Sequence, residues 1–318
     1  MESIELKEVS KSFKGTPILE NINLKIEEGD VLGIIGQSGS GKTTLLNLIG
    51  GFLEPTDGEV VYYSKVEKQA LDLNKNLNKI KKYIGFNPQH TSFYPKLTVK
   101  ENLLHFGQMY RLKKETLLTN ANSLLEFTRL EKHQKKLADQ LSGGMQRRLD
   151  LACSLVHKPK FLVLDEPTSD LDFILQEEIG HLIQEVNKQG VTIVVASHHL
   201  DFLEKICNKI AILHEGKLKS YGNIGNVQKP FFKEDIVINI KVKEDKEKII
   251  KILKTLPVKK IVDQGHQLIV YPENPEKTML ALLQAVKKED LYLYDVDLRK
   301  PSLNEIFTKV TKGYKVEE

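Results

Sequence analysis

The most informative stretch of this sequence of 318 residues is Gly36-Gln37-Ser38-Gly39-Ser40-Gly41-Lys42-Thr43-Thr44. It satisfies the pattern G-x-x-x-x-G-K-[ST], follows the apolar run Val31–Ile35 and precedes a helix-prone segment. Glycines let the backbone wrap closely around phosphate, and the loop N–H groups and the following helix N-terminus supply positive potential. We expect Lys42 to reach the β- and γ-phosphates and the Thr43 hydroxyl to ligate Mg²⁺. The stretch therefore predicts a strand, loop and helix that bind a nucleoside triphosphate.

A second apolar run, Phe161–Leu164, ends in the adjacent carboxylates Asp165 and Glu166. Ligands of open α/β sheets bind at the carboxyl ends of parallel strands, which is where these acids would lie. Asp165 could hold Mg²⁺ through water, and Glu166 could orient or deprotonate the water that attacks a phosphate. A strand that ends in two acids is a weak signal alone, but it is strong beside a phosphate-binding loop.

A third motif, Ser142-Gly143-Gly144, opens a long helix-compatible segment and would place free N–H donors at a helix N-terminus. It would be a second anion site in one chain, which is redundant unless it serves another nucleotide or faces the first site across a dimer. Taken alone, the motif is also consistent with an ordinary serine cap followed by flexible glycines.

Composition excludes several classes of protein and names no partner. The net charge is +4, from 47 basic and 43 acidic residues that are interspersed, so nucleic acid is not an expected partner. No apolar run approaches the roughly 20 residues that a membrane-spanning helix needs, and the N-terminus lacks the profile of a secretory signal. The two cysteines, Cys153 and Cys207, suggest neither a disulfide framework nor a zinc site. These features predict a cytoplasmic location.

Short apolar runs alternate with segments of helical period through about residue 215, which predicts an α/β domain with a largely parallel sheet. The segment Leu71–Lys82 interrupts this pattern and is expected to form an exposed loop or short helix. Ser220–Pro230 is rich in Gly and Asn, which marks a boundary between domains at 1–222 and 230–318.

The second domain has the order strand, helix, strand, strand, helix, strand, which is typical of a ferredoxin-like α+β fold. The expected elements are Ile236–Val242, Lys246–Leu256, Lys259–Val262, Gln267–Tyr271, Glu276–Lys288 and Leu291–Leu298. A last helix is indicated by the capping-box pattern that runs from Ser302 to Glu305.

From Ile4 to about Leu218 the chain resembles the ATP-binding subunits of ABC transporters, with the motifs in the expected order. The resemblance implies a P-loop ATPase with a RecA-like core and a helical signature subdomain. It identifies residues 36–43 as Walker A, 161–166 as Walker B with the catalytic Glu166, and 141–146 as the signature. It further implies that Gln89 meets Mg²⁺, that His198 contacts the γ-phosphate, and that 169–172 form the D-loop.

The resemblance also places Phe13 where such subunits stack an aromatic ring on adenine. Simpler roles remain open for three of these residues: Phe13 as a core residue of an edge strand, Gln89 as a polar loop residue, and His198 as a capping or solvated histidine. His199 has no assigned role. Met145, Asp170 and Asn87-Pro88 depart from the usual family pattern, but they remove no group that hydrolysis needs.

Three segments are similar to the drug, sodium and polysaccharide exporter group, whose membrane subunits are of the ABC-2 type: 93–103, 145–155 and 297–307. The resemblance implies an ATPase that uses ATP and Mg²⁺, with Lys42, Glu166 and His198 as catalytic residues. Its partners would be a second ATPase subunit and a separate ABC-2 type permease that docks near Thr91–Pro95, on the cytoplasmic face of the membrane.

The alternative is a soluble ABC ATPase that acts on ribosomes or DNA without a transporter. Such proteins usually carry two cassettes, coiled-coil insertions or zinc-binding cysteines, and none of these is evident here. The second domain has no phosphate loop or catalytic pair, which favours an accessory role in packing or dimerisation and leaves ligand sensing open. The transported substrate is not indicated by any residue of this chain.

Overall fold

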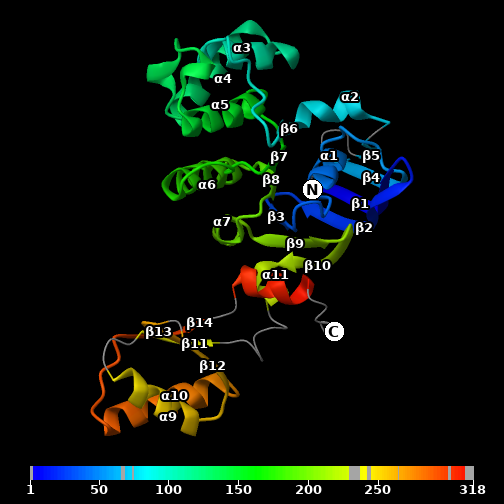
Figure 1. Ribbon diagram of the computed structural model, residues 1–318. Coiled ribbons are helices and arrows are strands. Elements are labelled where there is room, and N and C mark those ends of the chain that lie inside the picture. Colours follow the sequence, from blue (N-terminus) through cyan, green and yellow to red (C-terminus); the bar gives the residue numbers. More distant parts are fainter. Residues whose placement is uncertain are drawn as a thin grey trace. The chain divides into compact units, whose positions relative to one another are not determined.

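The computed structural model describes residues 3–65, 69–73, 75–228, 237–241, 245–263, 265–299 and 302–311 (Figure 1). It divides into two compact units, Met1–Ile224 and Gly225–Glu318. Residues 229–236, which include the expected boundary residue Pro230 and the start of the expected strand Ile236–Val242, lie outside the described residues.

A six-stranded sheet forms the centre of the first unit, in the order β10-β9-β3-β8-β7-β6. Its strands are β3 (Val31–Ile35), β6 (Ile84–Asn87), β7 (Phe161–Asp165), β8 (Thr192–Ala196), β9 (Lys209–His214) and β10 (Lys217–Asn223). All neighbours are parallel except the antiparallel pair β9–β10. Strands β3, β7 and β8 are buried along their whole length, as apolar strands of a parallel sheet must be. The α/β prediction is confirmed.

A second, antiparallel sheet was not predicted; its order is β2-β1-β4-β5. The strands are β1 (Ser3–Phe13), β2 (Thr16–Glu27), β4 (Asp57–Ser64) and β5 (Gln69–Asp72). The segment Leu71–Lys82, expected to be an exposed loop or short helix, contains the last two residues of β5 and the short helix α2 (Leu77–Ile80). That expectation is wrong at Leu71 and Asp72, because these residues pair with β4 and the side chain of Leu71 is buried.

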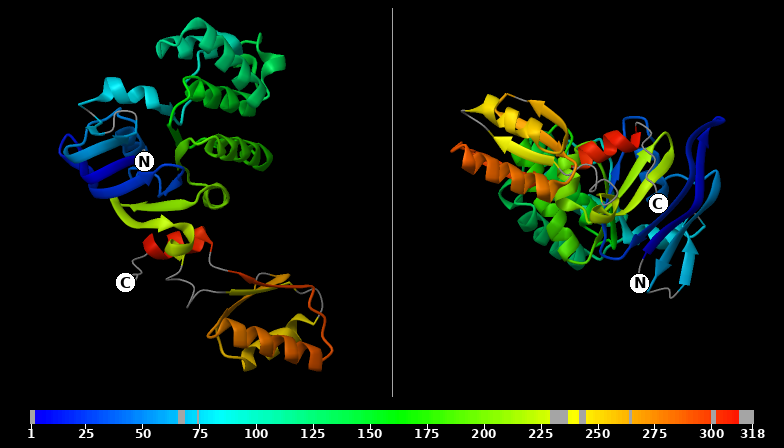
Figure 2. Two further views of the ribbon diagram at one scale, coloured as in Figure 1. Left: turned by 180° about the vertical axis from the view of Figure 1, so that it is seen from behind. Right: turned by 90° about the horizontal axis from the view of Figure 1, so that it is seen from below.

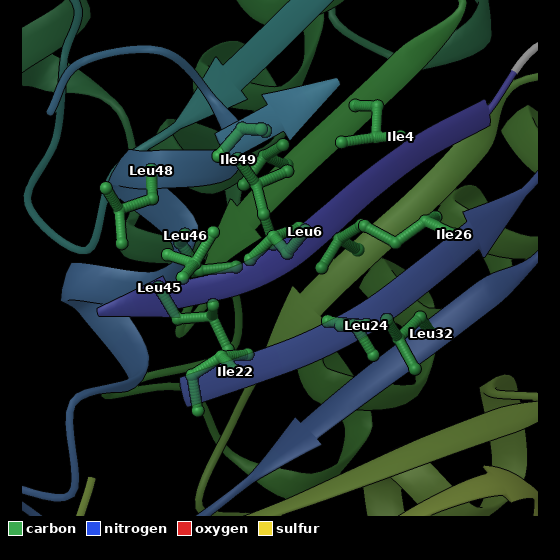
Figure 3. Close-up of a cluster of buried hydrophobic side chains, with 14 of the residues drawn as sticks. Ile4, Leu6, Ile22, Leu24, Ile26, Leu32, Leu45, Leu46, Leu48 and Ile49 are labelled. Carbon is green, nitrogen blue, oxygen red and sulfur yellow. The ribbon is translucent and has the colours of Figure 1, made fainter. Parts of the chain in front are cut away.

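Helix α1 (Lys42–Ile49) packs into a hydrophobic core that includes residues of both sheets. Figure 3 shows side chains of β1 and β2 beside those of α1 and β3, among them Ile4, Ile22, Leu32 and Leu46. Full burial of one such side chain stabilises a fold by about 1.5–3 kcal/mol. The core therefore fixes the first turn of α1, and with it the end of the glycine-rich loop.

The helices α3 (Val99–Met109), α4 (Lys114–Phe127) and α5 (Gly143–Leu155) form a separate group with its own hydrophobic cluster (Figure 1). Helix α3 begins with a capping box, in which Glu101 N donates to Thr98 Oγ1 at 3.2 Å and Thr98 N donates to Glu101 Oε2 at 2.8 Å. The unit also contains α6 (Phe173–Lys188) and α7 (Leu200–Ile206). Helices α3, α4 and α5 form the helical subdomain that was expected from the sequence.

The second unit contains a four-stranded sheet with two helices on one face (Figure 2). Its elements are β11 (Val237–Lys241), α9 (Lys246–Thr255), β12 (Val258–Asp263), β13 (Gln267–Pro272), α10 (Pro275–Lys288), β14 (Asp295–Arg299) and α11 (Leu303–Thr311). The order β12-β13-β11-β14, with antiparallel neighbours, is that of a ferredoxin-like fold, as predicted.

Two expected boundaries are wrong by several residues. Strand β14 begins at Asp295 rather than Leu291, because Leu291 N bonds back to Val286 O at the end of α10 at 3.0 Å. Strand β10 continues to Asn223, into the segment expected to interrupt regular structure, because it pairs with β9. Among the described residues, no helix combines the length and the apolar character needed to cross a membrane.

Candidate nucleotide-binding site

The glycine-rich loop joins β3 to α1 at the carboxyl end of the parallel sheet. A Cβ atom at Gly36 would lie 2.7 Å from the backbone oxygen of Leu213, closer than real side chains approach. At Gly41 the backbone has φ +102°, and a Cβ atom would lie 2.8 Å from Leu19 Cδ2. These two positions require glycine, since any larger residue would push the loop away from its neighbours.

The Lys42 ammonium is held by the loop itself. Its Nζ donates to the backbone oxygen of Gly36 at 2.9 Å and to that of Gln37 at 3.3 Å. Because both acceptors are neutral carbonyls, the positive charge of the ammonium is not cancelled there. The arrangement suits a group that meets the charge of a polyphosphate.

Asp165 is buried at the end of β7, and its carboxylate accepts a hydrogen bond from the Thr43 side chain. Burial raises the pKa of Asp165; the Thr43 bond and the charge of Lys42 lower it, and the charge of Glu166 raises it. Asp165 Oδ1 has no hydrogen-bond partner among the described residues. An unpartnered carboxylate oxygen next to a hydroxyl is a donor set that fits Mg²⁺, which prefers oxygen ligands.

Among the residues that the structure describes, no group of three or more His, Cys, Asp or Glu side chains is placed to bind a metal ion. The candidate Mg²⁺ ligands remain those predicted from the sequence: the Thr43 hydroxyl, the Gln89 amide and the Asp165 carboxylate.

Glu166 is held in a left-handed backbone conformation, with φ 49°, directly after β7. Its backbone N donates to Ala196 O at 2.9 Å, which ties it to the end of β8. Its Oε2 lies 2.8 Å from His198 Nδ1 and accepts from His198 N at 3.3 Å. The Glu166 side chain is 9% exposed and that of His198 is 59% exposed, so the pair joins a buried carboxylate to a ring open to solvent.

His199, which had no predicted role, lies against His198, with 4.1 Å between the ring centroids. Burial lowers the pKa of His199, the neighbouring His198 lowers it further, and Glu166 raises it. His199 N donates to Ser197 Oγ at 3.1 Å.

Ten of the predicted site residues line one open cleft, although they come from four separate parts of the sequence. They are Ser38, Gly39, Gly41, Lys42, Thr43, Thr44, Gln89, Asp165, Glu166 and His198. The cleft is also lined by Ile18 of β2, which sequence reasoning missed because a single isoleucine in a strand carries no motif.

The other predicted residues do not line this cleft. Gly36, Gln37 and Ser40 belong to the same loop, and the Ser40 side chain is buried. Phe13, at the end of β1, is 44% exposed and therefore not a core residue; Lys11 Nζ lies 5.1 Å from its ring centroid.

The signature residues Ser142, Gly143 and Gly144 are at the start of α5, in the helical subdomain (Figure 1). Gly144 packs against α6, where a Cβ atom would lie 2.8 Å from Leu175 Cδ2. Ser142 makes no side-chain cap bond to the helix. The structure thus does not bring the signature to the phosphate loop of the same chain.

Two protein families match the chain. Residues 19–169 match the family described as ABC transporter, and residues 222–311 match the C-terminal domain of the DrrA1-3-like ATP-binding proteins.

Related proteins match over different lengths of the chain. The linearmycin resistance ATP-binding protein LnrL of Bacillus subtilis is 26% identical over 97% of this chain and 98% of its own length. The methionine import ATP-binding protein MetN of Clostridium tetani is 36% identical over 70% of this chain and 69% of its own. An uncharacterized ABC transporter ATP-binding protein of Alkalihalophilus pseudofirmus is 30% identical over 88% of this chain and its whole length.

Among solved structures, a dimeric ATP-binding cassette in a post-hydrolysis state, bound to ADP and Pi, aligns with a TM-score of 0.61 and 33% identity. The alignment covers 70% of this chain and 98% of that cassette. The phosphate loop, the paired acids and the family matches agree. The chain belongs to the ATP-binding proteins of the ABC transporter family and is an ATPase.

Proposed function

We propose that this chain is the ATP-hydrolysing subunit of an ABC-2 type exporter, working from the cytoplasmic face of the membrane through a separate membrane subunit. One observation carries the proposal: the likeness to a drug-resistance ATP-binding protein extends over both units. LnrL matches over 97% of the chain, and the DrrA1-3-like family matches residues 222–311. The importer relative MetN matches over 223 residues, about the length of the first unit alone.

We further propose that the two units are the functional domains, with the ATPase at 1–222 and the accessory ferredoxin-like domain at 230–318. MetN is named an import ATP-binding protein and the Alkalihalophilus relative an ABC transporter ATP-binding protein, which does not favour a soluble ATPase acting on ribosomes or DNA.

In the proposed reaction, a water attacks the γ-phosphate of ATP in line with the leaving ADP. Glu166 takes the proton of that water, and His198, held by Glu166 at 2.8 Å, contacts the γ-phosphate. Lys42 and the N–H groups of the loop stabilise charge that develops on the phosphate oxygens. Thr43, Gln89 and Asp165 would hold Mg²⁺, which supplies further charge neutralisation when it is bound.

The proposed working form is a dimer with two ATP molecules at the interface. Each ATP lies between the loop 36–44 of one subunit and Ser142–Gly144 of the other. Support comes from the place of the signature: it begins a 13-residue helix, yet it does not line the cleft of its own chain. Phosphate charge between two helix N-termini would draw the subunits together, and hydrolysis would release them.

Glu166→Gln tests the catalytic part of the proposal. The amide keeps the size of the side chain but cannot take a proton, so ATP binding should persist, turnover should stop and a dimer should accumulate. Equilibrium binding of ATP, phosphate release and size-exclusion chromatography with ATP would measure these effects. Wild-type turnover in Glu166→Gln would exclude Glu166 as the base.

Purification of the tagged full chain from detergent-solubilised membranes tests the partner. We expect a polytopic membrane protein to co-purify, and uptake of substrate into inside-out vesicles to depend on ATP. Co-purification of ribosomes or DNA in its place would contradict the transporter proposal.

A further inference from the structure

A buried arginine outside the cleft connects two loops that border it. Arg147 lies on α5 and is only 9% exposed. Its Nη1 donates to the backbone oxygen of Gln89 at 3.0 Å, and its Nη2 donates to Ser169 Oγ at 2.6 Å. One guanidinium therefore joins the segment after β6 to the segment after β7.

The second of these connections continues to the proposed base. Ser169 N donates to the backbone oxygen of Glu166 at 3.1 Å. An unbroken path of hydrogen bonds thus runs from the backbone of Gln89, through Arg147 and Ser169, to the backbone of Glu166. Gln89 and Glu166 both line the cleft, and they follow two neighbouring strands of the sheet, β6 and β7.

Asp150, one helical turn after Arg147, holds the same segment at its other end. Its Oδ1 accepts from Ser92 N at 2.9 Å, from Ser92 Oγ at 3.0 Å and from Phe93 N at 3.3 Å. Burial raises the pKa of Asp150, while the bonds from Ser92 and the charge of Arg147 lower it. Helix α5 therefore holds residues 89–93 through hydrogen bonds from two of its side chains, Arg147 and Asp150, which are one helical turn apart.

The guanidinium suits this role because its planar fork carries several N–H donors in fixed directions. A lysine has one nitrogen, and a glutamine amide is too short to reach two acceptors on separate loops. Arg148, the next residue, has a different partner. It forms an ion pair with Glu178 of α6, whose side chain is 37% exposed, and it takes no part in the hydrogen bonds to Gln89 and Ser169.

We propose that Arg147 is a positioning residue for ATP hydrolysis, which fixes Gln89 relative to Glu166 through the Gln89 backbone and the Ser169 hydroxyl. The inference rests on the proposed function, in which Gln89 and Glu166 act on the same nucleotide. Misplacement of a catalytic group by about 1 Å can lower a rate by about a hundredfold.

Steady-state ATPase kinetics of the full chain tests the inference. In Arg147→Gln we expect kcat to fall about tenfold while KM for ATP stays within about twofold, because the phosphate loop is untouched. Ser169→Ala, a milder change, should lower kcat in the same direction. The double variant should be no slower than Arg147→Gln alone, because both changes break one path.

The matched control is Lys209→Gln. Lys209 is also a largely buried cation with two acceptors, since its Nζ contacts Glu27 at 2.8 Å and Asp30 at 2.9 Å with 15% of the side chain exposed. It does not line the cleft. Its loss should lower the unfolding midpoint as Arg147→Gln does, but it should leave kcat unchanged.

Hydrogen exchange of the amides in residues 89–93 gives a second measurement. Exchange should accelerate in Arg147→Gln and in Ser169→Ala, and stay at the wild-type rate in Lys209→Gln. The inference is overturned if Arg147→Gln and Ser169→Ala keep wild-type kcat, or if Lys209→Gln lowers kcat equally. The proposed function is tested separately: ATP hydrolysis by Glu166→Gln at the wild-type rate would contradict it, whatever the result for Arg147→Gln.

Discussion

His157 gives the first unit a specific sensitivity to acid. The residue follows α5, and its ring stacks on that of Tyr110 with 3.6 Å between centroids and 5° between planes. Its Nε2 lies 3.2 Å from the backbone oxygen of Ile84, and its Nδ1 is buried with no partner among the described residues. A proton on Nδ1 would therefore have no acceptor, and burial lowers the pKa of His157 from 6.5 to about 4.

The direction in which pH changes the free energy of unfolding depends on proton uptake by His157 in the folded and unfolded states. Below pH 6.5 the unfolded chain binds a proton at His157, whereas the folded chain does so only near pH 4. The free energy of unfolding should therefore fall between pH 6.5 and pH 4, and this contribution should level off below that. At about 1.4 kcal/mol per pKa unit, the loss amounts to about 3 kcal/mol.

Urea denaturation at a series of pH values from 7 to 4 measures the effect. His157→Phe keeps an aromatic ring against Tyr110 but cannot bind a proton, so its stability should fall less steeply with pH than that of the wild type. His181→Gln on α6 is the control, because His181 is exposed in the folded chain. An equal loss of stability in wild type and His157→Phe across this range would refute the reasoning.

Three further predictions concern single side chains. Gly36→Ala should weaken ATP binding at least about tenfold, because the added Cβ meets the Leu213 carbonyl at 2.7 Å; wild-type affinity by calorimetry would contradict this. Phe13→Ala should raise the Kd for ATP about fivefold if the exposed ring stacks on adenine, whereas an unchanged Kd would exclude that role. Lys241→Ala should leave the thermal midpoint unchanged, because its pair with Asp295 is exposed on both sides; a clear drop would show otherwise.

The parallel sheet and the phosphate-binding loop of the first unit could be predicted from the sequence, because each motif is a continuous run of residues that adopts its conformation locally. The loop from Gly36 to Thr43 and the acids after β7 are continuous in sequence, and each lies where a parallel strand ends. Their meeting in one cleft follows from the shared edge of the sheet.

The antiparallel sheet and β5 could not be predicted in the same way. Strand β5 is only four residues long, it is followed by a stretch rich in Asn and Lys, and it pairs with β4. Such pairing is a long-range effect that overrides local propensity.

The structural roles of Arg147 and Asp150 also could not be predicted from the sequence. Charged residues on a helix are usually solvated, and neither their burial nor their partners near Gln89 and Ser92 can be recognised from spacing on α5 alone.

The place of β3 in the sheet also sets an order of events during synthesis. Its residues pair on one side with Ile193–Ala196 and on the other with Lys209–Ile212, whereas β1 pairs with β2 and β4 from the first 63 residues. The antiparallel pairs of β1 can therefore assemble early on a growing chain, but β3 gains no neighbour until the ribosome has passed β8, and it has both neighbours only after β9 has been synthesised. The frame of the phosphate loop is thus completed late, and ATP can act as a folding ligand only for a nearly finished first unit.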